Sequence, residues 1–513
     1  MKGPAESQII DPYLTAGTSQ LDTTFRDPAG RLLLTQTHAL RQIRPASAEA
    51  TLAFLASPLR AALEKSGDLI PTQIASHSVH SCVVPGELWL EHPRIDPITY
   101  PWEWTPAQWR AAADLTLHIA GRAIRDGWTL KDATPLNILF IGPRPILVDV
   151  LSFERRDPQS TVWLAYGQFV RTFLLPLVAA KYLSWPLGAT ILARDGYEPA
   201  EIYKALGPIQ RLSPSFFDVV TLATKLERPE RERSRSDRSG NKSQPGRKSP
   251  PATRDPELAA HILLKRIARL GRQISKTASS SDRTQWSEYT QSARHYKPKD
   301  VAAKQEFVKN MLQRCGPSRV LDVGANTGAY SLIAAEAGAS VLAIDADAAA
   351  IEVLGQTAAQ RKLPITTLVA NIARPTPAAG WRNREHLSLL DRLTGKFDLV
   401  LMLAVIHHFL LREQLPLPHI AELCASLTNR WLVLEWVPPS DPMFQEWLRG
   451  RDDLYGHLTE DDLERAFLPF FILADRNPLS NGRVLFLLER IPSDAAAPTA
   501  GAPAETSSEA SSA

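Results

Sequence analysis

This sequence has few cysteines, no long apolar run and only a small net charge. Its three cysteines, Cys82, Cys315 and Cys424, are scattered among 513 residues without metal-ligand spacing. This pattern argues against a disulfide framework and predicts a reducing compartment, the cytoplasm. The best apolar candidate, 173–180, is short and contains a proline, so we expect no transmembrane segment. The first residues also lack the basic-then-apolar pattern of a signal peptide.

The overall balance of charge argues against nucleic acid as a partner. Lysine and arginine total 58 against 55 acidic residues, which gives a net charge of +3. So slight an excess makes nucleic acid a poor candidate partner for the whole chain. A hydrophobic content of 44% is that of a soluble globular protein. Because 513 residues exceed one ordinary core, we expect two or more domains.

Two segments of biased composition stand out, and apolar residues almost vanish from the first of them. Residues 226–255 are rich in Arg, Lys, Ser and Pro, and 491–513 in Ala, Ser, Pro and Glu. We interpret them as a disordered basic linker and a disordered tail; for the linker, an RNA- or lipid-binding tract is the alternative. An α+β module is expected at 20–225 and a second domain at 286–490. Between them, 256–285 contains an amphipathic basic helix, which packs on a domain or lies on a membrane surface.

The most informative stretch, 319–345, reads RVLDVGANTGAYSLIAAEAGASVLAID. An apolar run leads into a glycine turn at 324–328, a helical pattern follows, and a second apolar run ends in Asp345. A strand, a tight loop, a helix and a strand in this order bind the adenosine part of a cofactor at the carboxyl ends of parallel strands. The glycines let the backbone approach the ligand, and the terminal carboxylate can accept hydrogen bonds from both ribose hydroxyls.

An acidic residue inside the first apolar run distinguishes between nucleotides. The spacing is Asp322-x-Gly324-x-Asn326-x-Gly328 rather than the dinucleotide pattern G-x-G-x-x-G. A carboxylate beside a diphosphate would repel it, whereas it attracts a cation. At these residues the chain resembles the class I S-adenosylmethionine (SAM)-dependent methyltransferases, with Asn326 in place of the more usual middle glycine. The alternative interpretations are a Rossmann dehydrogenase and a chance glycine turn.

Later apolar segments follow the order that this family has. Segments similar to its remaining strands are 368–371, 396–404, 431–436, 470–473 and 484–488. The resemblance implies an α/β fold for 286–490: a Rossmann-like, doubly wound, seven-stranded sheet, mostly parallel, with helices on both faces and an antiparallel end.

The same resemblance implies a set of SAM-binding residues. Asp322 would lie near the methionine amino group, Asp345 would bind the ribose hydroxyls, and Asn371 would meet the adenine edge. The other residues implied at the cofactor are Gly324, Ala325, Asn326, Gly328, Ala346, Leu403 and Ala404.

Three residues are candidates for a general base. His407 and His408 follow the expected fourth strand, at the rim where substrate enters in this family, and a histidine there can titrate near neutral pH. Their alternative role is to pack against or cap the next helix. Glu435, at the end of the fifth strand, is either a base or a helix cap or salt-bridge partner. The N-P-P-Y/F motif of amino-methylating nucleic-acid enzymes is absent after the fourth strand.

The N-terminal region contains a second, weaker resemblance. Asp132, Asn137 five residues later, and Asp149 at the end of an apolar run resemble the catalytic loop and metal-binding acid of the protein-kinase-like fold. By that resemblance Asp132 would be the base, and Asn137 and Asp149 would hold Mg²⁺ on ATP. Leu130 stands where the family has histidine, and no glycine-rich phosphate loop precedes it. The alternative is a helical substrate-binding domain, in which Asp132 caps a turn and Asp149 forms an ion pair.

If 20–225 has the protein-kinase-like fold, its amino-terminal strands are expected within 24–44, with a hairpin turn at 27–30. No clear V-A-I-K lysine is present, and Arg41 or Arg44 would have to substitute for it.

The sequence therefore predicts a SAM-dependent methyltransferase whose acceptor is a small molecule or a saccharide. A bifunctional protein with an N-terminal phosphotransferase and a non-catalytic binding protein remain the alternatives.

Overall fold

The computed structural model describes residues 27–226, 252–277 and 298–492, except 36, 78, 81 and 451. The predicted disordered linker and tail therefore lie almost wholly outside the described residues. The chain divides into two compact units: Met1–Arg294 with Ser318–Thr394, and His295–Pro317 with Gly395–Ala513.

The N-terminal module begins with a small antiparallel sheet. Its strands are β1 (Gly30–Leu34), β2 (His38–Ile43), β3 (Gln73–Ile74) and β4 (Leu88–Pro93), in the order β1-β2-β4-β3. Helices α1 (Pro45–Leu55) and α2 (Pro58–Ser66) lie between β2 and β3 in the chain. Ser57 caps α2 because its side chain accepts a hydrogen bond from the Arg60 N–H.

The predicted hairpin turn at 27–30 is wrong. Gly30 already belongs to β1, and the Asp27 side chain accepts a hydrogen bond from the Ala29 N–H in the approach to that strand. The turn between β1 and β2 is closed instead by Thr35, whose N–H and hydroxyl both donate to the His38 carbonyl. Thr35 thus closes the turn at 35–38, eight residues after the position that the Asp-Pro-Ala-Gly sequence led us to expect.

Helix α3 (Pro106–Arg125) is the longest helix of the described part of 27–226. A capping box between Thr105 and Gln108, with Pro106 at the first position, fixes its start. The remaining elements of this region are β5 (Trp128–Leu130), β6 (Ile138–Ile141), β7 (Arg144–Leu147), β8 (Phe153–Arg155), α4 (Tyr166–Phe169), the π-helical η4 (Val170–Leu174), α5 (Leu175–Leu183), α6 (Pro199–Ala205), the π-helical η7 (Phe217–Leu222), and the 3₁₀ turns η1 (Pro101–Glu103), η2 (Pro135–Asn137), η3 (Val150–Ser152), η5 (Leu187–Ile191) and η6 (Gln210–Leu212).

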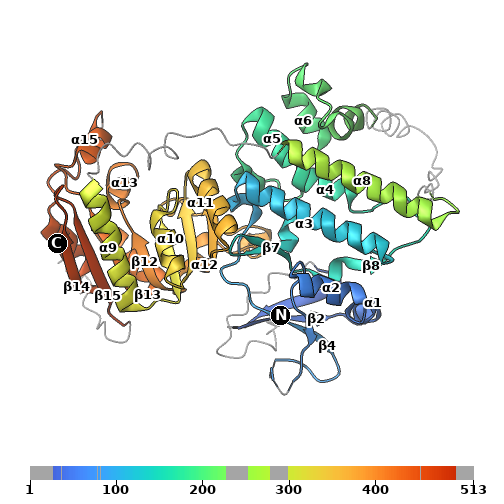
Figure 1. The fold of residues 1–513 in the computed structure, drawn as a ribbon, viewed down its shortest axis with the longest axis horizontal. Helices are drawn as coiled ribbons and strands as arrows, with labels where there is room; N and C mark the ends of the chain where they lie inside the picture. The colour runs from blue at the N-terminus through green and yellow to red at the C-terminus, as the bar shows by residue number, and fades with distance from the viewer. Residues whose placement is uncertain are drawn as a thin grey trace, which may run out of the picture. The chain divides into compact units, whose positions relative to one another are not determined.

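Helix α8 (Pro256–Thr277) is the predicted amphipathic helix, and it packs along α3 (Figure 1). Two glycines permit the close approach: Gly121 of α3 lies against Leu264, and Gly271 of α8 lies against Leu117. The apolar stripe of α8, which includes Leu263 and Leu270, is buried. This face is therefore occupied by the N-terminal module, as the packing interpretation predicts.

The C-terminal sheet has seven strands in the order β11-β10-β9-β12-β13-β15-β14. The first unit contributes β9 (Arg319–Val323), β10 (Ser340–Asp345) and β11 (Ile365–Val369), which pair in parallel, with α10 (Ala329–Glu336), α11 (Ala348–Arg361), η9 (Trp381–Asn383) and α12 (Leu389–Leu393). The second unit contributes α9 (Pro298–Cys315), β12 (Phe397–Met402), α13 (Ile406–Leu411), α14 (Leu417–Leu427), β13 (Thr428–Trp436), α15 (Pro442–Leu448), α16 (Glu460–Phe467), β14 (Phe471–Pro478) and β15 (Val484–Arg490).

Strands β12 and β13 are parallel, whereas β15 is antiparallel to both β13 and β14. The strands β9, β10 and β12 are apolar almost throughout because both faces of a parallel sheet are covered. This architecture confirms the predicted α/β fold class with its antiparallel end.

The unit boundary falls after Thr394, inside the C-terminal sheet, although we expected a division within 226–285. Buried contacts from the N-terminal module to 318–394 account for this. Arg392 forms an ion pair with Glu103, with both side chains 1% exposed, and its guanidinium also donates to the Ile98 carbonyl. Gln108 of α3 donates to the Thr367 carbonyl of β11 at 2.9 Å.

Among the described residues, every helix is too short or too polar to cross a bilayer.

Candidate cofactor site and catalytic candidates

The loop that follows β9 turns through residues in the left-handed region. Gly324, Asn326 and Gly328 have φ angles of 71°, 50° and 87°. Asparagine tolerates this conformation better than other side chains, which explains how Asn326 replaces a glycine here. A side chain at Gly328 would require Leu354 to shift, because a Cβ there would meet Cδ1 of Leu354 at 2.1 Å. The two glycines therefore leave the backbone without side chains at both ends of the loop that follows β9.

Asp345, at the end of β10, holds this loop. Its Oδ2 accepts a hydrogen bond from the Asn326 N–H at 2.8 Å, and its Oδ1 accepts one from the Asp347 N–H at 2.8 Å. Burial raises the pKa of Asp345, and the two main-chain donors partly offset that rise. A carboxylate has about four lone-pair sites, so these bonds leave acceptor capacity for further donors such as a pair of ribose hydroxyls. The residue thus fits the role expected for it.

Asp322 lies inside β9 and is 2% exposed. Its Oδ2 accepts a hydrogen bond from the Ser331 hydroxyl at 2.6 Å. This bond ties the first turn of α10 to β9, so Asp322 has a positioning role in the fold beside any contact with a cofactor. Ser331 was missed in the sequence, because a serine inside a helix has no distinguishing pattern.

Two other candidates lie beyond the ends of β10 and β11. Ala346 is exposed directly after Asp345, and Asn371 is half-buried two residues after β11. The side-chain oxygen of Asn371 accepts a hydrogen bond from the Ala373 N–H at 2.9 Å, which shapes the turn after β11. Ala325 is buried in the glycine loop. These residues and the loop all follow carboxyl ends of parallel strands, where α/β sheets bind ligands.

In the second unit, Leu403 and Ala404 follow β12. Leu403 is buried, and Ala404 has a φ of 56°. A left-handed alanine costs about 1–2 kcal/mol, and such strain concentrates at functional sites. The strained residue lies three positions before His407, the first of the two histidine base candidates.

His407 and His408 are the second and third residues of helix α13 and differ in exposure. His407 is 3% exposed, and burial is the main reason that its pKa lies well below 6.5; His408, Arg483 and Lys304 lower it further. His408 is half-buried, its ring lies 5.0 Å from that of Trp447, and burial lowers its pKa to about 4. Both imidazoles are therefore neutral at pH 7, and His408 is the more accessible of the two.

Glu435, at the end of β13, is fully buried within a charged cluster. Its carboxylate forms ion pairs with Lys304 of α9 and with Arg483, whose guanidinium also makes two bonds to Asp441 at 2.8 and 3.1 Å. Burial acts to raise the pKa of Glu435, but Lys304 and Arg483 together hold it below its ordinary value. An ionised, doubly paired carboxylate is poorly suited to accept a proton, so the geometry favours the salt-bridge interpretation over a base.

The three kinase-like candidates of the N-terminal module are gathered in one place. Asn137 donates to the Ser152 hydroxyl at 3.1 Å, and Ser152 donates to Oδ2 of Asp149 at 2.5 Å. Arg41 of β2 donates to Oδ1 of Asp149 at 2.7 Å. Burial is the main cause of a raised pKa at Asp132, and the nearby Asp149 carboxylate adds to it.

This donor set fits a magnesium ion only in part. Asn137 and Asp149 offer the oxygen ligands that Mg²⁺ prefers. However, both carboxylate oxygens of Asp149 are already engaged, one of them by the Arg41 cation. The ion pair of Asp149 agrees with the non-catalytic alternative as well.

One comparison with known proteins covers part of the C-terminal half, and another covers most of the chain. Residues 291–468 match the family model described as "Methyltransferase domain". The nodulation protein NoeA of Rhizobium meliloti (strain 1021) is 27% identical over 479 residues, which cover 91% of this chain and 95% of NoeA.

Solved structures with a similar fold include magnesium protoporphyrin IX methyltransferase (ChlM) from Synechocystis PCC 6803 with bound SAH. It is 22% identical, covers 37% of this chain and 84% of its own, and has a TM-score of 0.29. The bifunctional kinase-methyltransferase WbdD is also 22% identical, with 36% and 38% coverage and a TM-score of 0.27. Such scores carry no argument about substrate. The match of residues 291–468, the strand order and the glycine loop agree, and the C-terminal half of this chain contains a SAM-dependent methyltransferase domain.

Proposed function

We propose that this enzyme methylates a small molecule or a saccharide, with SAM held at the corner formed by the glycine loop and Asp345. The observation that carries the cofactor assignment is the Asp345 carboxylate. It fixes the loop through the Asn326 N–H and keeps acceptor capacity for two hydroxyl groups. Bound there, SAM supplies an electrophilic methyl group on a sulfonium.

The other cofactor residues have roles that follow from their places. The loop from Gly324 to Gly328 forms a wall without side chains that would clash with a ligand. Asp322 adds a buried negative charge beneath it, favourable to a cationic ligand. Ala346 and Asn371 line the adenine side in this proposal, and Leu403 with Ala404 lies at the end of β12.

Two features support a small acceptor rather than a nucleic acid. The residues after β12 read Ala404-Val405-Ile406-His407, not N-P-P-Y/F, and the net charge is only +3. The N-terminal module is also anchored by buried contacts to the half of the sheet that bears the cofactor loop. A rigidly attached module is what acceptor positioning requires, because alignment of nucleophile and methyl group supplies much of the rate.

We assign the base role to His408 in preference to His407 and Glu435. His408 is the least buried of the three, and its pKa of about 4 keeps it neutral and able to accept a proton at pH 7. The decline of kcat on the acid side of its pH profile should then have its midpoint near pH 4. His408→Ala should lower kcat by about 10²–10⁴-fold with little change in KM. An acid limb near pH 6.5, or an unchanged kcat in His408→Ala, would remove His408 from this role.

The acceptor is identified by feeding isotopically labelled methionine to cells that express the protein or its Asp345→Asn variant. The proposal expects a labelled small molecule or saccharide that is present with the wild type and missing with the variant. Label in nucleic acid or protein instead would overturn the acceptor class.

A phosphotransferase in the N-terminal module is a second candidate function, favoured by the clustering of Asp132, Asn137 and Asp149 around Arg41. The full chain should then bind ATP in a Mg²⁺-dependent manner, and Asp149→Asn should abolish binding. Asp114→Asn, which removes an exposed carboxylate of α3, is the control. If the wild-type chain binds no ATP, the phosphotransferase function is excluded, and the module is then an acceptor-binding domain.

A further inference from the structure

We propose that the N-terminal module contains a divalent transition-metal site, best suited to Zn²⁺, formed by His38, His80 and Glu91. One ligand atom from each of the three residues lies within 4.8 Å of the others. Nε2 of His38 is 3.1 Å from Oε1 of Glu91, and Nε2 of His80 is 3.1 Å from Oε2 of the same carboxylate. Two tetrahedral ligands of zinc are about 3.3 Å apart, so the cluster needs little adjustment to enclose an ion.

The register of the sheet brings two of these residues together. Leu40 of β2 is opposite Glu91 of β4 in the antiparallel pair. His38 lies two residues before Leu40 and therefore shares its face of the sheet, which makes His38 and Glu91 diagonal neighbours. Diagonal neighbours are within reach of long side chains, so the two ligands are placed by the strand pairing itself.

The third ligand comes from the loop between β3 and β4, and that loop is held against the same face. Val83 packs with Leu40, Ala75 and Trp89 in one buried cluster. Two main-chain bonds, from the His80 N–H to the Ser76 carbonyl and from the Val83 N–H to the His80 carbonyl, shape the loop around His80. The ligand frame is thus built from packed elements rather than from side chains that meet by chance on a surface.

The chemistry of the cluster suits a borderline cation. Two imidazoles and one carboxylate form a set used by zinc, whereas Mg²⁺ and Ca²⁺ prefer oxygen ligands. Nε2 of His80 is buried and makes no hydrogen bond, although it lies so close to Glu91. Nδ1 of His38 is 2.8 Å from the Thr37 hydroxyl, the kind of outer contact that orients a metal-bound histidine.

The site is separate from the kinase-like cluster. Side chains alternate along a strand, so Arg41, which reaches Asp149, points to the opposite face of β2 from His38 and Leu40. A metal here would not touch the residues assigned to phosphate chemistry. Its role is to fasten the β3–β4 loop to the sheet. The His38 side chain is 36% exposed, which leaves one side open for a water ligand.

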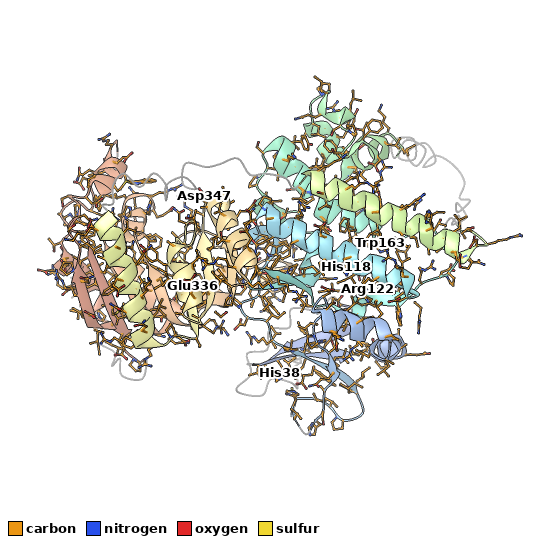
Figure 2. The ribbon with its side chains drawn as sticks, viewed as in Figure 1. His38, His118, Arg122, Trp163, Glu336 and Asp347 are labelled. Carbon is orange, nitrogen blue, oxygen red and sulfur yellow. The ribbon has the colours of Figure 1, made fainter. Side chains whose placement is uncertain are left out.

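The test uses full-length protein, stripped with a chelator and titrated with ZnCl₂ by calorimetry, with zinc counted by mass spectrometry after desalting. The proposal predicts one zinc per chain and a higher Tm. His80→Ala and Glu91→Gln should lose the bound zinc, and Thr37→Val should bind it about tenfold more weakly. His118→Ala is the matched control, because His118 is an exposed histidine of α3, away from His38 (Figure 2).

Co²⁺ substitution separates metal loss from unfolding, since the visible absorption of the bound ion reports its nitrogen and oxygen ligands directly. Spectral change in wild type and in His118→Ala, but not in folded His80→Ala, supports the site. No retained zinc in the wild type would show that the three residues form only an ion-paired cluster. Zinc retained equally by His80→Ala and Glu91→Gln would place the metal elsewhere. Either result overturns the proposal.

Discussion

The Asp345 carboxylate and the Asn326 main-chain N–H, 19 residues apart, are joined by a hydrogen bond of 2.8 Å. This bond links the end of β10 to the glycine loop after β9, so the geometry of the loop depends on the same residue that is proposed to bind the ribose. The loop in turn depends on backbone conformations that few residues adopt. Glycine and asparagine at these positions are therefore requirements of the fold as well as of ligand approach.

Gly328→Ala should destabilise the protein far more than Gly338→Ala. Both glycines have positive φ, 87° and 98°, but a Cβ at Gly328 would meet Leu354 at 2.1 Å, whereas nothing lies within 4 Å of one at Gly338. We expect a cost of about 2–5 kcal/mol at Gly328, where backbone strain and overpacking add, and about 1–2 kcal/mol at Gly338. Urea unfolding measures both. Equal costs would show that Leu354 moves aside freely.

Arg392→Met should strand the charge of Glu103 in the interior. Both side chains are 1% exposed, and removing one partner of a buried pair costs about 3–5 kcal/mol. Arg384→Met, at an exposed position nearby, should change the free energy of unfolding by less than about 0.5 kcal/mol.

Adding Glu103→Gln to Arg392→Met should restore part of the loss, because the stranded charge is then removed. A cost below about 1 kcal/mol for Arg392→Met alone would contradict the role given to this pair in joining the N-terminal module to 318–394.

Stability should fall as pH drops from 7 to 5. Burial, with the nearby Arg41, lowers the pKa of His92 to about 4, against about 6.5 in the unfolded chain. The unfolded chain therefore binds more protons between these values, and stability declines as pH falls through 6.5. The loss at pH 5 is on the order of 2 kcal/mol for this residue. His92→Gln should remove its share of this dependence, while the lowered pKa values of His407 and His408 keep the rest. Identical slopes in wild type and His92→Gln would refute the assignment.

The sequence allowed the C-terminal fold to be predicted because its signals are local. Buried parallel strands are continuous apolar runs, and the glycine turn and Asp345 fall within 26 residues of Arg319. The partners of Glu435 could not be predicted in this way. Lys304 is 131 residues before it and Arg483 is 48 after it, and no local pattern indicates which charges will meet in the core.

The same limit applies to the N-terminal module. Asp132, Asn137 and Asp149 were recognisable by spacing, but the Arg41 partner of Asp149 lies 108 residues away. The hairpin turn was misplaced because Asp-Pro-Ala-Gly has strong turn chemistry, whereas the true turn is closed by an ordinary threonine side chain at Thr35. The cluster of His38, His80 and Glu91 could not be predicted either, because it depends on strand register rather than on sequence spacing.

Binding of SAM to the full-length protein, compared between wild type and Asp345→Asn by calorimetry, tests the central claim most directly. Glu336→Gln is the control, because it removes an exposed carboxylate of the same unit at the end of α10, apart from Asp347 (Figure 2). We predict one SAM per chain in wild type and Glu336→Gln, and binding about tenfold to a hundredfold weaker in folded Asp345→Asn, since hydrogen bonds to a charged group are lost. SAM affinity that is equal in wild type and Asp345→Asn, or no binding by the wild type, would contradict it.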